Sequence, residues 1–186
     1  VKLISKTPEK NSAFVTGEIG ENNTYKTIIG ADVAQDGFYA QVRGQRLETD
    51  GTQVTDFKNT NVKPADYDQK GFSSKFGVEK QDYALSLDYQ QNQGSTGYID
   101  CGAYDASYNC AGLKNMAQDF KNEIINMKGR VNLNSDLSLN ARLSQFKDDI
   151  DQKNSNFDGT YDFIHSNTQE AELYGKWQYT PQQNIL

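Results

Sequence analysis

The sequence contains little of what most catalytic and metal sites require. Histidine occurs once, at His165, and no serine or cysteine nucleophile accompanies it in a recognisable motif. Glycine-rich phosphate loops are absent. The acidic run that contains Asp149 lacks calcium-loop spacing, because Lys153 stands at the fifth position and the required glycine is missing. We therefore expect no catalytic residue, no bound metal, no cofactor and no enzymatic activity.

The sequence also lacks long hydrophobic runs and any concentration of positive charge. No apolar stretch approaches the roughly 20 residues of a transmembrane helix. The 19 Lys and Arg residues face 25 Asp and Glu residues and are scattered along the chain, which argues against nucleic acid as a partner. Its 11 Tyr and 9 Phe residues are too many for a disordered polypeptide. One β-rich domain, either soluble or a membrane barrel, fits this composition.

Only two cysteines are present, Cys101 and Cys110, in a stretch rich in Gly, Ser, Asp and Tyr. No histidine or third cysteine stands nearby to complete a zinc site. A local disulfide is the prediction, and it implies an oxidising compartment such as a periplasm or cell surface. The alternative is a pair of free thiols in a cytosolic protein.

Apolar residues recur at every second position in eight segments, the pattern of strands with one apolar and one polar face. A mean hydropathy of -0.81 fits a membrane barrel, whose polar lumen hides the apolar face in any average. Within residues 111–125, the three- and four-residue spacing of Leu113, Met116, Phe120 and Ile124 predicts a short loop helix. The eight expected strands cover residues 13–19, 25–33, 38–44, 72–78, 83–89, 125–133, 137–143 and 171–179.

The connections between these segments alternate in length, with one short exception near residues 21–24. Tight turns are expected at 34–37, 79–82, 134–136 and 180–184, and long loops near 47–70, 91–123 and 146–168. Such asymmetry is typical of outer-membrane barrels. A soluble or surface β-sandwich that buries the apolar faces between two sheets remains an alternative, as does a stand-alone eight-stranded barrel.

Several stretches resemble TonB-dependent outer-membrane receptors of the iron-complex type. The similar stretches are Val1–Pro8, like the end of the plug; Gly17–Tyr25, like the first hairpin; Gln45–Gly51, like the strand before the second loop; and Asn156–Phe163, like a loop segment. The TonB box, a complete plug and a terminal aromatic residue are missing. The resemblance implies an all-β fold, an antiparallel transmembrane β-barrel segment with about eight strands of a barrel of about 22.

In this interpretation residues 1–12 end the plug and lead into the barrel, and residues 13–186 form barrel wall with long extracellular loops. The implied function is active import of a siderophore or other metal complex through the outer membrane of a Gram-negative bacterium. Its partners would be membrane lipid, the transported complex, and the TonB complex, which is engaged through parts not in this chain.

Aromatic side chains in the expected loops are the candidate ligand contacts, because aromatic rings can stack on a ligand and loops carry function on rigid scaffolds. These candidates are Tyr98, Tyr104, Tyr108, Phe157, Tyr161, Phe163 and His165. A second feature is a group of cations on neighbouring polar faces, formed by Lys128, Arg130, Arg142 and Lys176. It can attract an anionic metal complex, but pairing with Glu172, Asp88 and plug carboxylates is the preferred interpretation.

Overall fold

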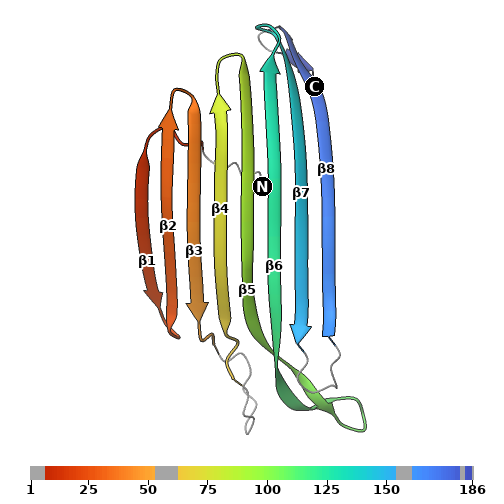
Figure 1. Cartoon of the computed structure of the whole chain (residues 1–186). Coiled ribbons are helices and arrows are strands. Elements are labelled where there is room, and N and C mark those ends of the chain that lie inside the picture. Colours follow the sequence, from red (N-terminus) through yellow and green to blue (C-terminus); the bar gives the residue numbers. More distant parts are fainter. Residues whose placement is uncertain (1–6, 53–62, 154–160, 181–182, 186) are drawn as a thin grey trace.

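The computed structural model describes residues 7–52, 63–153, 161–180 and 183–185, and these form one antiparallel sheet (Figure 1). Each strand pairs with its neighbours in sequence, so that the spatial order is the chain order. The all-β antiparallel fold is therefore confirmed. The strands are β1 (Ser12–Gly20), β2 (Thr24–Gln35), β3 (Phe38–Thr49), β4 (Tyr67–Glu79), β5 (Tyr83–Tyr104), β6 (Cys110–Asn132), β7 (Leu137–Lys153), β8 (Tyr161–Thr180) and β9 (Gln183–Ile185).

The sheet is open. Within the described ranges β1 pairs only with β2, and β8 pairs with β7 along its length and with the three-residue β9 near its end. A stand-alone eight-stranded barrel requires β1 to pair with β8, so this alternative does not describe the observed sheet. A sandwich requires a second sheet, and the described residues contain one sheet only.

The eight predicted segments correspond to β1 to β8, with Leu133 just beyond the end of β6, but several strands are longer than expected. The expected loop near 91–123 is mostly strand, because β5 continues to Tyr104 and β6 starts at Cys110. The expected loop near 146–168 is likewise mostly strand, since β7 ends at Lys153 and β8 starts at Tyr161. These extensions have polar residues on both faces, which removes the period-two signal while leaving backbone pairing intact.

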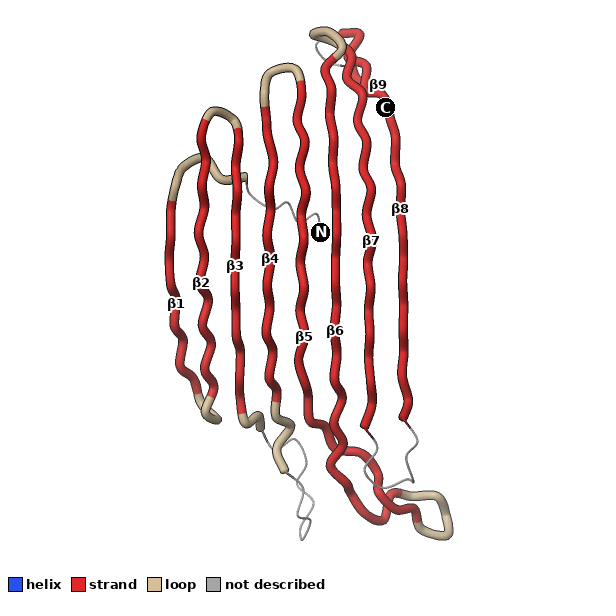
Figure 2. Tube along the Cα trace, viewed as in Figure 1, coloured by secondary structure: helices blue, strands red, loops and turns tan. Residues whose placement is uncertain are grey.

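The predicted helix within 111–125 is wrong, because this segment is part of β6. Met116, Phe120 and Ile124 are four residues apart, and residues at that spacing share a face in a strand as well as in a helix. The tube view contains no helical segment in the described residues (Figure 2). No helix among them is long and apolar enough to cross a membrane.

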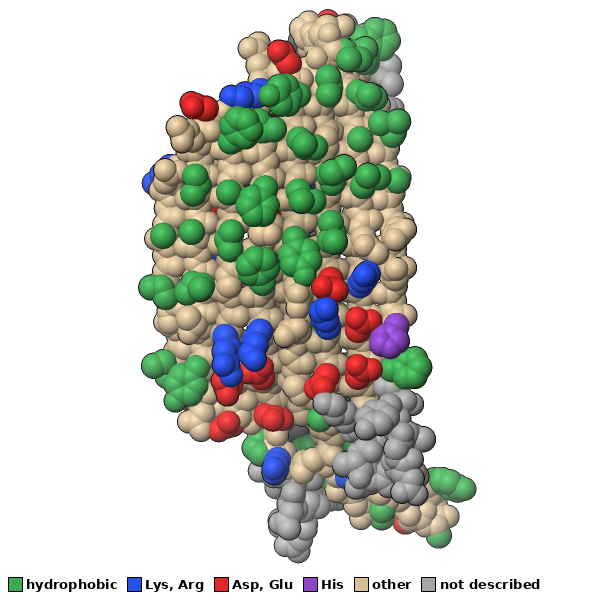
Figure 3. Space-filling view, in the orientation of Figure 1, with side chains coloured by type: hydrophobic (Ala, Val, Ile, Leu, Met, Phe, Trp, Pro, Cys, Tyr) green, Lys and Arg blue, Asp and Glu red, His purple; other side chains and the backbone are tan. Residues whose placement is uncertain are grey.

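The register aligns the apolar residues of successive strands into rows on one face. One row crosses seven strands through Val33, Ala40, Phe76, Leu87, Met127, Leu143 and Ala171. Residues one position along each strand point to the opposite face. We call the first the apolar face and the second the polar face. Figure 3 looks onto the apolar face, where hydrophobic side chains extend across the sheet.

The sheet has almost no interior of its own. Met116 is the one buried hydrophobic residue among those described, and the large apolar side chains elsewhere are half-buried or exposed. On β2, the polar-face residues are partly buried while the apolar-face residues are exposed, in strict alternation. Side chains of the polar face therefore shelter one another, which makes this the hollowed side of the sheet.

The β2–β3 turn has the chemistry predicted for a tight hairpin. Asp36 and Gly37 have φ values of 51° and 79°, the left-handed region that two-residue turns of this type require. A Cβ added to Gly37 would stand 2.5 Å from the backbone oxygen of Glu79, so both conformation and space favour glycine.

We expect Gly37→Ala to lower the free energy of unfolding by about 1 kcal/mol or more, because alanine is strained at positive φ and lacks space here. Urea titration checks this value. Gly17→Ala is the matched control, since a Cβ at Gly17 meets nothing within 4 Å, and it should change stability by less than about 0.5 kcal/mol. Equal effects of the two substitutions would contradict the prediction.

Candidate functional site

The polar face carries a broad depression with a volume of about 900 Å³. Polar side chains from several neighbouring strands line it, because alternate residues of each strand point to this face. The main lining residues are Tyr39 on β3, Lys75 on β4, Asp88 on β5, Lys128 and Arg130 on β6, and Arg142 on β7. The depression therefore concentrates charged groups on the hollowed side of the sheet.

Cations dominate the middle of this depression. Lys128 and Arg142 are direct register partners across β6 and β7, and Arg130 is two residues farther along. Like charges directly opposite each other destabilise a sheet. Two acidic residues of β8 offset the charge of Arg142: Glu170 accepts a hydrogen bond from it, and Glu172 lies 4.0 Å away.

The other carboxylates at the depression pair with other cations of its lining. Glu79 lies 3.4 Å from Arg130, and Asp88 lies 3.9 Å from Lys75. The expected pairing with Glu172 is therefore present for Arg142, whereas Asp88 pairs with Lys75. Lys176 lines a neighbouring depression near the β6–β7 turn and not this one.

Three buried polar atoms at the depression have no hydrogen-bond partner among the described residues. They are Nε of Arg130, Nε of Arg142 and Oδ1 of Asn126. Buried donors normally have partners, because an unpaired polar group is costly to bury. The surface can therefore accept an anionic or carbonyl-bearing group. No three His, Cys, Asp or Glu side chains in the described part of the chain are arranged to hold a metal ion.

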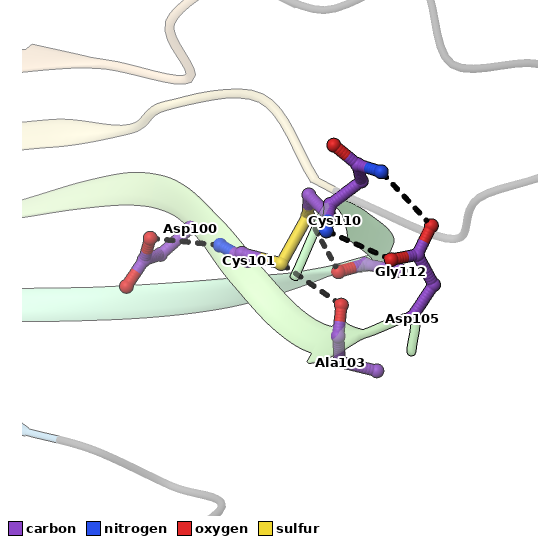
Figure 4. Close-up of a disulfide and its surroundings, with 7 residues drawn as sticks. Asp100, Cys101, Ala103, Asp105, Cys110 and Gly112 are labelled. Carbon is purple, nitrogen blue, oxygen red and sulfur yellow. Dashed lines mark hydrogen bonds between the residues drawn. A yellow bond between two sulfur atoms is a disulfide. The ribbon is translucent and has the colours of Figure 1, made fainter. Parts of the chain in front are cut away.

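The extension of β5 and β6 forms a long hairpin that projects beyond the neighbouring strands (Figures 1 and 2). Cys101 and Cys110 form a disulfide near its tip, as predicted, with their Cα atoms 5.6 Å apart (Figure 4). Asp105 caps the turn by accepting hydrogen bonds from the backbone N–H groups of Ser107 and Asn109, both at 2.8 Å. The N–H of Asn109 in particular lowers the pKa of the Asp105 carboxyl group.

A small packed region anchors the base of this hairpin. The ring of Tyr67 stacks on that of Phe120 at 5.9 Å, and Met116 is buried nearby on β6. The connection before β4 packs along the hairpin, because Gly97 N–H donates to the backbone oxygen of Asp66 at 2.8 Å. Sequence reasoning missed this anchor, since the helix prediction placed these β6 residues in the wrong element.

The seven predicted ligand contacts fall into separate places. Tyr104 and Tyr108 lie at the hairpin tip with exposed fractions of 64% and 88%, and Tyr98 lies partly buried on the hairpin stem. Tyr108 has a φ of 61°, a conformation that is rare for a bulky residue. The tip therefore holds two solvent-facing aromatic rings on a clamped turn.

Phe163 and His165 lie on β8, away from the hairpin tip. Their rings are 5.1 Å apart, and Nδ1 of His165 is 2.7 Å from Oδ1 of Asp149. Register places both on the apolar-face side of β8. Phe157 and the side chain of Tyr161 lie outside the described residues. Among the residues that are described, the structure does not bring the predicted contacts into one site, and their binding role stays a prediction.

Comparison with known proteins gave no match among family models, curated proteins or solved structures. The resemblance to TonB-dependent receptors therefore rests on the sequence patterns given above.

Removing the disulfide should loosen the hairpin tip. We expect the combined substitutions Cys101→Ser and Cys110→Ser to destabilise the tip by about 2–3 kcal/mol, because the short closed loop loses its entropic constraint. Hydrogen exchange of the amides within 98–116 should accelerate, while exchange in β2 and β3 stays unchanged. Reduction of the natural protein should reproduce the effect. Unchanged exchange at the tip would contradict a clamping role.

Proposed function

We propose that this sheet is part of the wall of an outer-membrane β-barrel in a Gram-negative bacterium, with its apolar face against lipid and its polar face toward the lumen. The observation that carries the proposal is a face of aligned apolar side chains that nothing in the described structure covers. Ile29, Leu85 and Leu139 retain exposed fractions of 55%, 50% and 44%. In a soluble sandwich such residues would pack against a second sheet.

The height of the apolar face is similar to that of the apolar band of outer-membrane barrels. On β2 it extends from Tyr25 to Val33. Eight steps of about 3.3 Å give about 27 Å, or about 20 Å for strands tilted by about 40°. Outer-membrane barrels carry an apolar band about 25 Å tall.

Aromatic residues at both edges of the band support the same orientation. Phe38, Tyr83 and Trp177 lie near the tight turns, and Phe72 and Tyr89 lie toward the long hairpin. The Tyr89 hydroxyl is hydrogen-bonded to Gln91 at 2.9 Å and Glu123 at 3.1 Å. A ring on the apolar face with its hydroxyl among polar groups is the arrangement of an interfacial girdle.

The proposed wall and the sequence resemblance together support a transport role. We propose TonB-dependent import of a siderophore or other metal complex, in which the polar face lines the lumen and the clamped hairpin faces the ligand outside the cell. The open edges at β1 and β8 fit a barrel completed by further strands. The cationic depression suits an anionic complex or carboxylates that line the lumen.

Lipid exposure of the apolar face is directly testable in the natural full-length protein. We expect spin labels at Leu85→Cys and Leu139→Cys in bilayers to collide with oxygen, which concentrates in lipid. Labels at the matched neighbours Ser86→Cys and Asn140→Cys should collide with a water-soluble nickel complex instead. Site-directed electron paramagnetic resonance measures both.

Two results would overturn the wall proposal. A protein that stays soluble without detergent, with the labels at 85 and 139 shielded from both reagents, would support the sandwich alternative. Equal nickel accessibility at all four positions would show that the two faces do not meet different solvents.

The import role predicts a ligand-binding effect at the hairpin tip. We expect Tyr104→Ala combined with Tyr108→Ala to weaken uptake of the transported iron complex about 30-fold, because each of the two lost stacking contacts removes about 1 kcal/mol. Cellular uptake of radioactive iron, screened with a panel of ferric siderophores, provides the measurement. Tyr83→Ala, at the opposite end of β5, is the control for general destabilisation. Equal losses in the tip variant and the control would argue against ligand contact.

A further inference from the structure

A belt of charged residues lies on the same side of the sheet as the apolar face, between the apolar band and the long hairpin (Figure 3). Register continues the apolar-face positions of β3 to β8 directly into this belt. We call it the outer belt. Its residues are Arg46, Glu48, Asp68, Lys70, Asp119, Lys121, Glu123, Lys147, Asp149, Asp151 and His165.

The charges of the outer belt are layered on three of its strands. On β3, β4 and β7 the first charged residue beyond the apolar band is a cation, and the next position on the same face is a carboxylate. These ordered pairs are Arg46 then Glu48, Lys70 then Asp68, and Lys147 then Asp149. On these three strands the cation therefore lies nearer the apolar band than the carboxylate, whereas on β6 Glu123 comes first and Lys121 follows it.

Two of these cations stand side by side. Arg46 and Lys70 are direct register partners across β3 and β4, an arrangement that is unfavourable unless an anion joins them. Nη2 of Arg46 lies 2.9 Å from Glu48 and 3.3 Å from Asp68, both on the far side from the apolar band. Lys70 is exposed and has no ion-pair partner among the described residues. Positive charge thus remains available on the side that borders the apolar band.

We propose that Arg46 and Lys70 bind the phosphate of an anionic membrane lipid. The proposal rests on the wall function above and names the lipid chemistry that this wall contacts. Lipid phosphates lie immediately outside the hydrocarbon layer, which is the level of these two side chains relative to the apolar band. Arginine suits phosphate because its planar guanidinium donates two parallel hydrogen bonds, and lysine adds a mobile point charge.

The neighbouring residues favour a lipid over a free anion. The row next to Arg46 and Lys70 contains Ile29 and Phe72, whose exposed side chains offer apolar surface to the acyl chains of the same lipid molecule. Glu48 and Asp68 repel a phosphate that moves farther out, so the headgroup is held at Arg46 and Lys70. A lipid satisfies both the cationic and the apolar surface.

The test compares two lipids that differ in headgroup charge. The natural full-length protein is purified in detergent, and its binding of phosphatidylglycerol and phosphatidylcholine is titrated by native mass spectrometry. We expect preference for phosphatidylglycerol, and a loss of about fivefold in its affinity for Lys70→Gln and for Arg46→Gln, as a basic residue at a membrane surface contributes. The double variant should lose roughly 25-fold.

Lys26→Gln is the matched control. Lys26 lies on β2 opposite Leu47, the neighbour of Arg46, but on the polar face, where it pairs with Glu18 at 3.3 Å, so its loss should leave lipid affinity unchanged. Equal losses in this control and in Lys70→Gln would overturn the proposal. Displacement of the lipid by millimolar inorganic phosphate would also overturn it, in favour of a free-anion site.

These outcomes are separable from failure of the wall proposal. If the spin labels report a lipid-facing surface while phosphatidylglycerol and phosphatidylcholine bind equally, the wall stands and the phosphate site is wrong. If the protein stays soluble without detergent, both are wrong.

Discussion

Backbone pairing in a fixed register is the constraint on which the rest of this structure depends. The sheet buries almost no apolar surface of its own, so interstrand hydrogen bonds, and not a hydrophobic core, hold neighbouring strands together. A shift of one residue in any ladder would move every side chain of that strand to the other face. The paired strands β1 to β7 keep a continuous register up to the hairpin tip, where the ladder shifts between Cys101 and Tyr104. The separation of apolar from polar side chains follows from that regularity.

The polar face must satisfy its own charges because it is hollowed and partly shielded. On the first three strands it does so: Asp32 accepts hydrogen bonds from Arg43 at 2.6 Å, Gln41 at 3.1 Å and Ser12 at 3.0 Å. The ring of Phe14 covers the same guanidinium at 4.9 Å. Around Arg130 and Arg142 the pairing is incomplete, which distinguishes the middle of the face from its β1–β3 end. The complete hydrogen-bond network around Asp32 stabilises the sheet, whereas the unpaired polar atoms around Arg130 and Arg142 can still bind another group.

Strands were predicted correctly from the sequence where one face is apolar and the other polar. They were missed where both faces are polar. Leu85 and Leu87 alternate with Ser86 and Asp88, and this contrast predicted a strand with both faces assigned correctly. Farther along β5 both faces are polar, so the strand looked like a loop although its backbone pairs with β6 in continuous register as far as Cys101. The cysteine pair was predictable from local composition alone. The Tyr67–Phe120 contact was not, because it joins residues far apart in sequence and no local pattern marks it.

The same strands therefore pass the apolar band, the outer belt and the stem of the long hairpin in one continuous register, which shifts only near the hairpin tip. β5 begins at Tyr83 beside exposed apolar neighbours, crosses the level of the outer belt, and ends at Tyr104 beyond it. Because a paired hairpin is stiffer than a loop, the exposed tyrosines at its tip are mechanically connected to the sheet rather than tethered loosely to it. The contact between Tyr67 and Phe120 and the bond from Gly97 to Asp66 brace the hairpin where it leaves its neighbours. A group bound at the tip would thus be held in a defined position relative to the polar depression, which a flexible loop of equal length could not achieve.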